Sequence, residues 1–231
     1  MVWTMAISPG GESPLEGFAS RARTALLAEG WQISREDPGD DGSIFVGDFQ
    51  KPLVADFVAT VELVLENGPI VQSFVGARRT SHFRVVVGGE FGVRHQPTAD
   101  LLTALEVHCE TNISLDIEEV FDAAGLSLPV ITDEHTTEDA ARVLVDAVNQ
   151  YGVPFAAEHA TVDTMLRFVS EGGQTTRDDM FEALFIPTLL AASGRSSEAK
   201  AALESYRARA THDAEQKQFG VFADRLTARL E

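Results

Sequence analysis

The first strong pattern of apolar positions predicts a helix over residues 13–29. Phe18, Ala22 and Leu26 recur at four-residue intervals, which places them on one face of a helix. Gly30 follows this segment, and a glycine in that place is typical of a helix end. We therefore expect one amphipathic helix ahead of the segments that follow.

Beyond Gly30 the pattern becomes extended. The segments WQISRE, SIFVGDF, PIVQSFVG and HFRVVVGGEFG are rich in β-branched and aromatic residues and are separated by turn residues. Residues 53–66 fit both an alternating strand and a helical stripe, but their four valines and the following Asn67-Gly68 pair favour a strand. Residues 31–92 are thus expected to form a mostly antiparallel sheet of four or five strands.

The rest of the chain is predicted to be mainly helical. We expect a helix or helical turn over residues 98–109 and a strand over residues 112–117. Helices are then expected over residues 118–125, 136–152, 161–173, 177–193, 197–210 and 212–230. Thr161 is expected to cap one of them, and Gly152 and Pro154 to end another. The order indicates an α+β fold: an N-terminal helix, a mostly antiparallel sheet and an all-helical C-terminal half.

Charge is spread unevenly along the 231 residues, whose net charge is −18. Residues 111–182 hold 15 acids and 3 bases, for −12, whereas residues 183–231 hold 6 acids and 7 bases, for +1. This asymmetry predicts a boundary near residue 175. We expect an α+β domain over residues 1–174 and a helical hairpin appendage over residues 175–231.

Composition argues against several classes of partner. The excess of acids disfavours nucleic acid and anionic membranes. The N-terminal residues lack the basic and apolar regions of a signal peptide, and the most apolar helical segment, FEALFIPTLLAA, is too short to span a bilayer. Cys109 is the single cysteine, so no intrachain disulfide can form. We expect a cytoplasmic protein, and the sequence leaves its oligomeric state open.

The stretch ASGRSSEAKAALESY, residues 192–206, resembles the turn and second helix of a tetratricopeptide hairpin. The matching positions are a turn glycine, a Glu-Ala pair and a large apolar residue: Gly194, Glu198, Ala199 and Leu203. Ser196 or Ser197 is expected to cap the second helix. Because no second copy follows at the spacing of about 34 residues, we expect one helical appendage and not a repeat array.

A longer part of the chain, roughly residues 15–172, resembles a family of small bacterial α+β proteins of unknown function. In that family a helix and a phenylalanine-rich sheet precede a Val-Pro-Phe or Ile-Pro-Phe signature and a short closing helix. Here GDFQKP lies in the sheet region, and the signature is Val153, Pro154 and Phe155. The resemblance implies a binding or immunity-type role and gives no catalytic residue to carry over. The additional C-terminal helices depart from the short members.

Residues with reactive side chains form no catalytic pattern. The six histidines include no pair at the helical spacing of metal ligands. The acids of TDEHTTED, residues 132–139, fit the first turn of a helix better than a calcium loop. Gly88, Gly89 and Gly92 fit a bulge or a close backbone approach better than a phosphate loop. We expect no metal, no cofactor and no catalytic residue, and we lean toward a protein that is not an enzyme.

One group of basic residues stands out in this acidic chain. It comprises Arg78, Arg79, His82, Arg84 and Arg94, with His95 beside it. Strands around residues 75–95 could present these side chains on one face, where they would bind an anionic ligand or an acidic partner. The alternative, which we favour, is internal pairing with the acidic middle of the chain.

Three functions fit these observations. The first, which we prefer, is a non-catalytic protein-interaction module of bacterial type, adaptor or chaperone-like, with a protein partner. The second is an immunity or antitoxin protein, whose acidic residues 111–182 would meet a basic toxin. The third is a small anionic ligand-binding protein or an enzyme, with a pocket between sheet and helices that uses His82 or Arg84.

Overall fold

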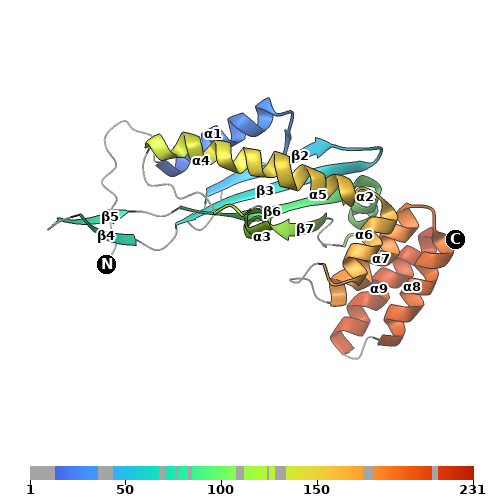
Figure 1. Cartoon of the computed structure of the whole chain (residues 1–231). Helices are drawn as coiled ribbons and strands as arrows, with labels where there is room; N and C mark the ends of the chain where they lie inside the picture. Colours follow the sequence, from blue (N-terminus) through green and yellow to red (C-terminus); the bar gives the residue numbers. More distant parts are fainter. Residues whose placement is uncertain are drawn as a thin grey trace. The chain divides into compact units, whose positions relative to one another are not determined.

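The structure is a computed structural model. It describes residues 14–35, 44–67, 71–75, 78–82, 85–107, 112–123, 125–127, 134–173, 179–209 and 213–231. Within them helix α1 (Pro14–Ala28) precedes a five-stranded antiparallel sheet, and the C-terminal half is mostly helical (Figure 1). The predicted α+β class is therefore confirmed.

Contacts between residues group the chain into two compact units. Unit 1 comprises residues 1–51, 61–91 and 116–153, and unit 2 comprises residues 52–60, 92–115 and 154–231. The predicted domain boundary, between residues 174 and 175, lies within residues 174–178, which are outside the described residues. The division into residues 1–174 and 175–231 stays a prediction.

The main sheet has the strand order β1-β2-β3-β6-β7. Its strands are β1 (Gln32–Arg35), β2 (Ile44–Pro52), β3 (Phe57–Asn67), β6 (Val85–His95) and β7 (Asn112–Asp116). β4 (Val71–Val75) and β5 (Arg78–His82) pair with each other in a separate two-stranded sheet. The prediction of one sheet over residues 31–92 needs this correction, because an alternating pattern does not say which strands pair.

β3 resolves the ambiguity of residues 53–66 in favour of a strand from residue 57 onward. Every second residue is buried: Phe57, Ala59, Val61, Leu63 and Leu65. Glu62, between two of them, is exposed. Ahead of the strand the chain turns, and the Phe57 N–H donates to the Val54 carbonyl at 2.9 Å. Burial with a period of two is what a sheet with one covered face requires.

In unit 1, two helices lie on one side of the sheet. α1 packs along α4 (Glu134–Ala147), and both run on the same side of β2 (Figure 1). The predicted inner face of α1 is fully buried: Phe18, Ala22 and Leu26. Trp31 follows α1, is also buried, and meets the ring of Phe91 edge to face at 6.1 Å between centroids. Removal of this apolar surface from water is the main stabilising contribution.

Two glycines of β6 allow neighbouring backbone to come close. A Cβ atom at Gly89 would overlap the carbonyl oxygen of Glu62 on β3. A Cβ atom at Gly92 would overlap the carbonyl oxygen of Ile113 on β7. The predicted close backbone approach is confirmed at both positions, and Gly89 has a φ of 131°, which other residues rarely adopt.

α4 does not end at Gly152, contrary to the prediction. It continues through a π-helical segment, η1 (Val148–Gly152), into α5 (Val153–Glu158). The Val153 N–H donates to the carbonyl of Val148, five residues back, which is the hydrogen bond that defines a π turn. The glycine is therefore inside a continuous helical path.

Packing explains why the helix continues through Gly152, although the glycine and Pro154 predict an end here. A Cβ atom at Gly152 would lie 2.6 Å from the ring of Phe91, so the glycine makes room for that ring. Pro154 directly follows the π-helical segment, at the second position of α5. Both residues break helices in many other settings.

Four helices of unit 2 share one apolar core: α2 (Gln96–Ala104), α7 (Asp179–Ala192), α8 (Ser196–Arg209) and α9 (Asp213–Arg229). A fifth, α6 (Val162–Ser170), packs against α7. α7 contacts the other four. Leu102 and Leu105, from α2 and its C-terminal end, join the same core as Leu203 of α8 and Phe219 of α9. The predicted buried stripe of α9 is confirmed at Phe219, Phe222 and Leu226.

Five described helices end in the same way: α1, α2, α3 (Ile117–Ala123), α6 and α7. In each, one N–H bonds a carbonyl three residues back, and the next N–H bonds a carbonyl five residues back. The residue with positive φ at these ends is Gly30, Glu106, Gly125, Gly172 or Gly194. Glycine takes this position after four of the five helices, so a glycine is a good indicator of a helix end here. At the end of α2 the position is taken by Glu106, with φ of 56°.

Candidate functional site

Three of the five basic residues selected from the sequence lie on β5. They are Arg78, Arg79 and His82. The strand pairs antiparallel with β4, so that Arg78 is opposite Val75 and His82 is opposite Val71. No other described strand pairs with this ribbon. Three basic positions are thus held within one five-residue strand.

The other two basic residues lie elsewhere. Arg84 is outside the described residues. Arg94 lies on β6 of the main sheet, is half-buried, and has an interaction partner within the chain. That all five residues act as one site stays a prediction.

His95, which joins β6 to α2, is buried. Its Nδ1 lies 2.8 Å from Oγ1 of Thr98, and its ring lies 4.8 Å from that of Phe57. Burial lowers the pKa of His95, and the negative charge of Asp56 raises it by less. The imidazole is therefore neutral at pH 7, as a packed structural residue would be.

His159 is held in an aromatic cluster. Its Nδ1–H donates to the Phe155 carbonyl at 2.9 Å, and its ring lies 4.4 Å from the ring of Phe155 and 4.8 Å from that of Phe168. These contacts attach α5 to α6. In the part of the chain that is described, no three His, Cys, Asp or Glu side chains gather as ligands of a metal ion would.

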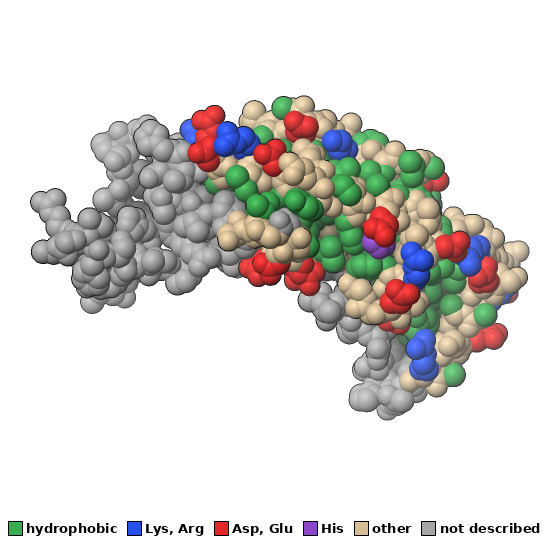
Figure 2. Space-filling view, viewed as in Figure 1, with side chains coloured by type: hydrophobic (Ala, Val, Ile, Leu, Met, Phe, Trp, Pro, Cys, Tyr) green, Lys and Arg blue, Asp and Glu red, His purple; other side chains and the backbone are tan. Residues whose placement is uncertain are grey.

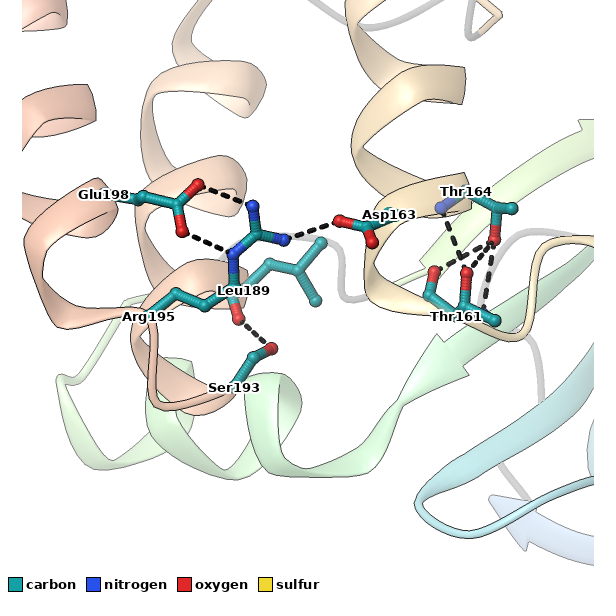
Figure 3. Close-up of polar contacts among 7 residues, drawn as sticks. All are labelled: Thr161, Asp163, Thr164, Leu189, Ser193, Arg195 and Glu198. Carbon is teal, nitrogen blue, oxygen red and sulfur yellow. Dashed lines mark hydrogen bonds and ion pairs between the residues drawn. The ribbon is translucent and has the colours of Figure 1, made fainter.

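Arg195 connects the turn between α7 and α8 to the start of α6 (Figure 3). Its Nε and Nη2 donate to the Glu198 carboxylate at 2.8 and 2.5 Å, and its Nη1 donates to Asp163 Oδ1 at 2.6 Å. The bonds to Glu198 and Asp163 raise the pKa of Arg195, and the bond from Arg195 lowers the pKa of Glu198. Because both carboxylates are largely exposed, water screens the attraction, and the clamp mainly orients the helices.

The start of α8 differs from the sequence prediction. The helix begins at Ser196, and its first intrahelical bond ends on the carbonyl of Arg195, which is therefore the capping position, where Ser196 or Ser197 was expected. The predicted cap of α6 is confirmed, because the Thr161 hydroxyl accepts the Thr164 N–H at 3.1 Å (Figure 3).

Two arginines of α9 bind the C-terminal end of α2. Arg225 Nη1 donates to the Leu105 carbonyl at 2.6 Å, and its Nη2 lies 3.1 Å from the Glu106 carboxylate. Arg229 Nη2 donates to the Ala104 carbonyl at 3.3 Å. Cations are favoured at this end of a helix because its last carbonyls are unpaired. The sequence places the two arginines on one helical face but does not indicate what they bind.

Tyr206 links α8 to both neighbouring helices. Its hydroxyl donates to Glu182 at 3.3 Å, and its ring meets that of Phe219 at 6.4 Å between centroids. The guanidinium of Arg209 lies 4.2 Å above the Tyr206 ring. Burial raises the pKa of the Tyr206 hydroxyl, with a smaller contribution from Glu182. Tyrosine and arginine are enriched in protein interfaces, so Tyr206 and Arg209 are candidate contact residues. The sequence pattern does not indicate this pair.

α3 presents acidic side chains to solvent. Glu118, Glu119 and Asp122 are exposed, and so is Asp116 immediately before the helix. None of the four forms an ion pair with another described residue. The sequence also contains no Lys or Arg over residues 95–141. Part of the predicted acidic block is therefore exposed and forms no ion pair within the described residues.

The described surface seen in Figure 2 carries hydrophobic, acidic and basic side chains interspersed with one another. Among the described helices, none combines the length and apolar character that crossing a membrane requires.

Comparisons with known proteins found no relative. No protein-family model, no curated protein and no solved structure matches this chain. The resemblances to a tetratricopeptide hairpin and to small bacterial α+β proteins therefore stay predictions.

Proposed function

We propose that the protein is a non-catalytic protein-interaction module that binds an acidic partner through β5. The observation that carries this proposal is the placement of Arg78, Arg79 and His82 on one strand of a ribbon that pairs with no other described strand. The sign of the charge on this strand is opposite to the net charge of −18 of the whole chain. Complementary charge directs association and selects the partner.

The helices of unit 2 support a role of adaptor or chaperone type. α2, α7, α8 and α9 are fixed by a common apolar core, and the Arg195 clamp sets the position of α6 against the turn. A preformed platform loses little conformational entropy when it binds. Tyr206 and Arg209 on this platform offer a further contact of the kind found in interfaces.

The test compares partner capture by the full chain and by two matched variants. R78A/R79A removes two charges from β5, and K200A/K217A removes two exposed charges from α8 and α9. We expect a stoichiometric protein partner at low salt, lost in R78A/R79A and kept in K200A/K217A, because β5 supplies the charged contact. Retention of the partner by R78A/R79A, together with a lowered melting temperature, would instead support internal pairing of the arginines.

A second candidate function is that of an immunity or antitoxin protein. The exposed acids of α3, which have no ion-pair partner among the described residues, favour it. Such a surface would accelerate association with a basic toxin at low ionic strength.

Variants that remove acidic charges test this alternative. E118Q/E119Q removes two charges from α3, and E158Q/E171Q removes two exposed charges elsewhere. If a basic protein is the partner, its association rate falls in the first variant and not in the second, and the rate depends steeply on salt. Equal rates for the two variants would count against a role of α3.

A further inference from the structure

β4 is a strand with one unpaired edge in the described part of the chain. β4 and β5 form a two-stranded sheet of their own, with five residues in each strand. A two-stranded ribbon of this length is at best marginally stable in water. Its outer edges pair with no other described strand, and the N–H and C=O groups at such an edge readily pair with another strand.

The two edges of the ribbon differ in their resistance to pairing. β5 has the sequence RRTSH, and two arginines at an edge repel an identical strand. β4 has the sequence VQSFV, which is uncharged and has three residues of high β propensity. Of the two edges, β4 is therefore the one suited to pair with a copy of itself.

The register of the ribbon shows which β4 residues have their backbone groups at the open edge. The pair Val75–Arg78 closes the hairpin, with two residues between them. In such hairpins the closing pair exchanges hydrogen bonds, and hydrogen-bonded pairs alternate with others along the ladder. The N–H and C=O groups of Gln72 and Phe74 are then directed away from β5.

We propose that β4 pairs antiparallel with β4 of a second copy, centred on Ser73, so that two ribbons form one four-stranded sheet. The sequence VQSFV is nearly symmetric about Ser73. This register places Val71 opposite Val75 of the second copy and Gln72 opposite Phe74, and cross-strand pairs of valines are favourable. The interface is isologous, as in most homodimers.

The charge pattern agrees with this arrangement. The two β5 strands occupy the outer edges of the four-stranded sheet, about 14 Å apart at about 4.8 Å per strand. That distance exceeds the screening length of about 8 Å at physiological salt, so the arginines of the two copies repel weakly. The inference goes beyond the proposed function and does not depend on what β5 binds.

A cysteine at the centre of the pairing tests the proposal. In the proposed register Ser73 faces Ser73 of the second copy as a non-hydrogen-bonded pair, with Cα atoms about 4.5 Å apart, which suits a disulfide. We expect mild oxidation to convert S73C/C109S to a covalent dimer, whereas S197C/C109S, with its thiol exposed on α8, should form little covalent dimer. The C109S change leaves the introduced thiol as the only one.

Light scattering on the unmodified chain completes the test. We expect the mean mass to rise toward that of a dimer with concentration, and Q72P/F74P to shift it toward the monomer without lowering the melting temperature. R78A/R79A should leave the dimer intact, which separates this inference from the proposed function. A monomer at every concentration, or a dimer that S73C/C109S does not cross-link, would overturn the proposal.

Discussion

Gly152 in the π-helical segment lies directly against the ring of Phe91 on β6, where no side chain could fit between them. The same ring meets Trp31, whose indole N–H is directed at Asn149 Oδ1 of the same segment at 3.5 Å. Because Gly152 has no Cβ atom, the π-helical segment can lie close to β6 in unit 1.

The first prediction concerns this contact. In G152A the new methyl group would lie 2.6 Å from a ring that is fully buried, so helix or ring must move. We expect the free energy of unfolding to fall by about 1–3 kcal/mol, measured by urea denaturation. The matched control is G220A, on α9, where no described atom lies within 4 Å of the added Cβ and stability should rise by about 0.5–1 kcal/mol. Equal effects of the two changes would contradict this account.

The second prediction is a dependence of stability on pH that comes from His95. Above pH 7 the imidazole is neutral in both the folded and the unfolded chain. As the pH falls below the ordinary histidine value of about 6.5, the unfolded chain binds a proton that the folded chain resists, because burial lowers the pKa of His95. The free energy of unfolding should fall until the folded pKa is reached and then level off.

Paired variants isolate the contribution of His95. H95N should have a flatter profile of unfolding free energy between pH 7 and the acid range than the unmodified chain, while H159Q should keep the slope due to His95. An H95N profile parallel to that of the unmodified chain would rule out the assignment.

The third prediction concerns the hydrogen bond from Arg225 to the end of α2. R225M keeps much of the side-chain length but leaves the Leu105 carbonyl without this donor. We expect a loss of about 1 kcal/mol in the free energy of unfolding, because the arginine is partly exposed and water replaces it in part. R229M, which removes a longer bond, should have a smaller effect. The reverse order would show that Arg225 is not the main contact.

The fourth prediction concerns the Arg195 clamp. R195A should lower the melting temperature slightly, and less than G152A, because the carboxylates of Asp163 and Glu198 are largely exposed. The difference from the unmodified chain should shrink in high salt, which screens exposed ion pairs. A large, salt-independent loss would indicate that the side chain acts through packing.

Local patterns in the sequence predicted most helices and strands correctly. The four-residue spacing of Phe18, Ala22 and Leu26, the alternation along β3 and the cap at Thr161 each depend on neighbours within a few residues. Such signals survive in any tertiary context that buries the apolar face.

The remaining features depend on residues far apart in the chain. The packing of Gly152 against Phe91 has no local signature, so the glycine alone predicts a helix end that the structure does not have. Glu106 adopts a positive φ although it is not glycine, and its carboxylate binds Arg225 of α9. The alternating pattern of β4 and β5 does not predict that they form a sheet of their own, because strand pairing depends on residues far apart in the chain. For the candidate site, the sequence selected the basic strand but gave no indication of the Tyr206–Arg209 pair.

The core of unit 2 takes Leu102 and Leu105 from the middle of the chain and Leu203 and Phe219 from near its end. On the ribosome, these two leucines emerge long before the helices that cover them. A nascent chain must therefore carry an uncovered apolar surface until α8 and α9 have also been translated, and it is during this interval that a holding chaperone would bind.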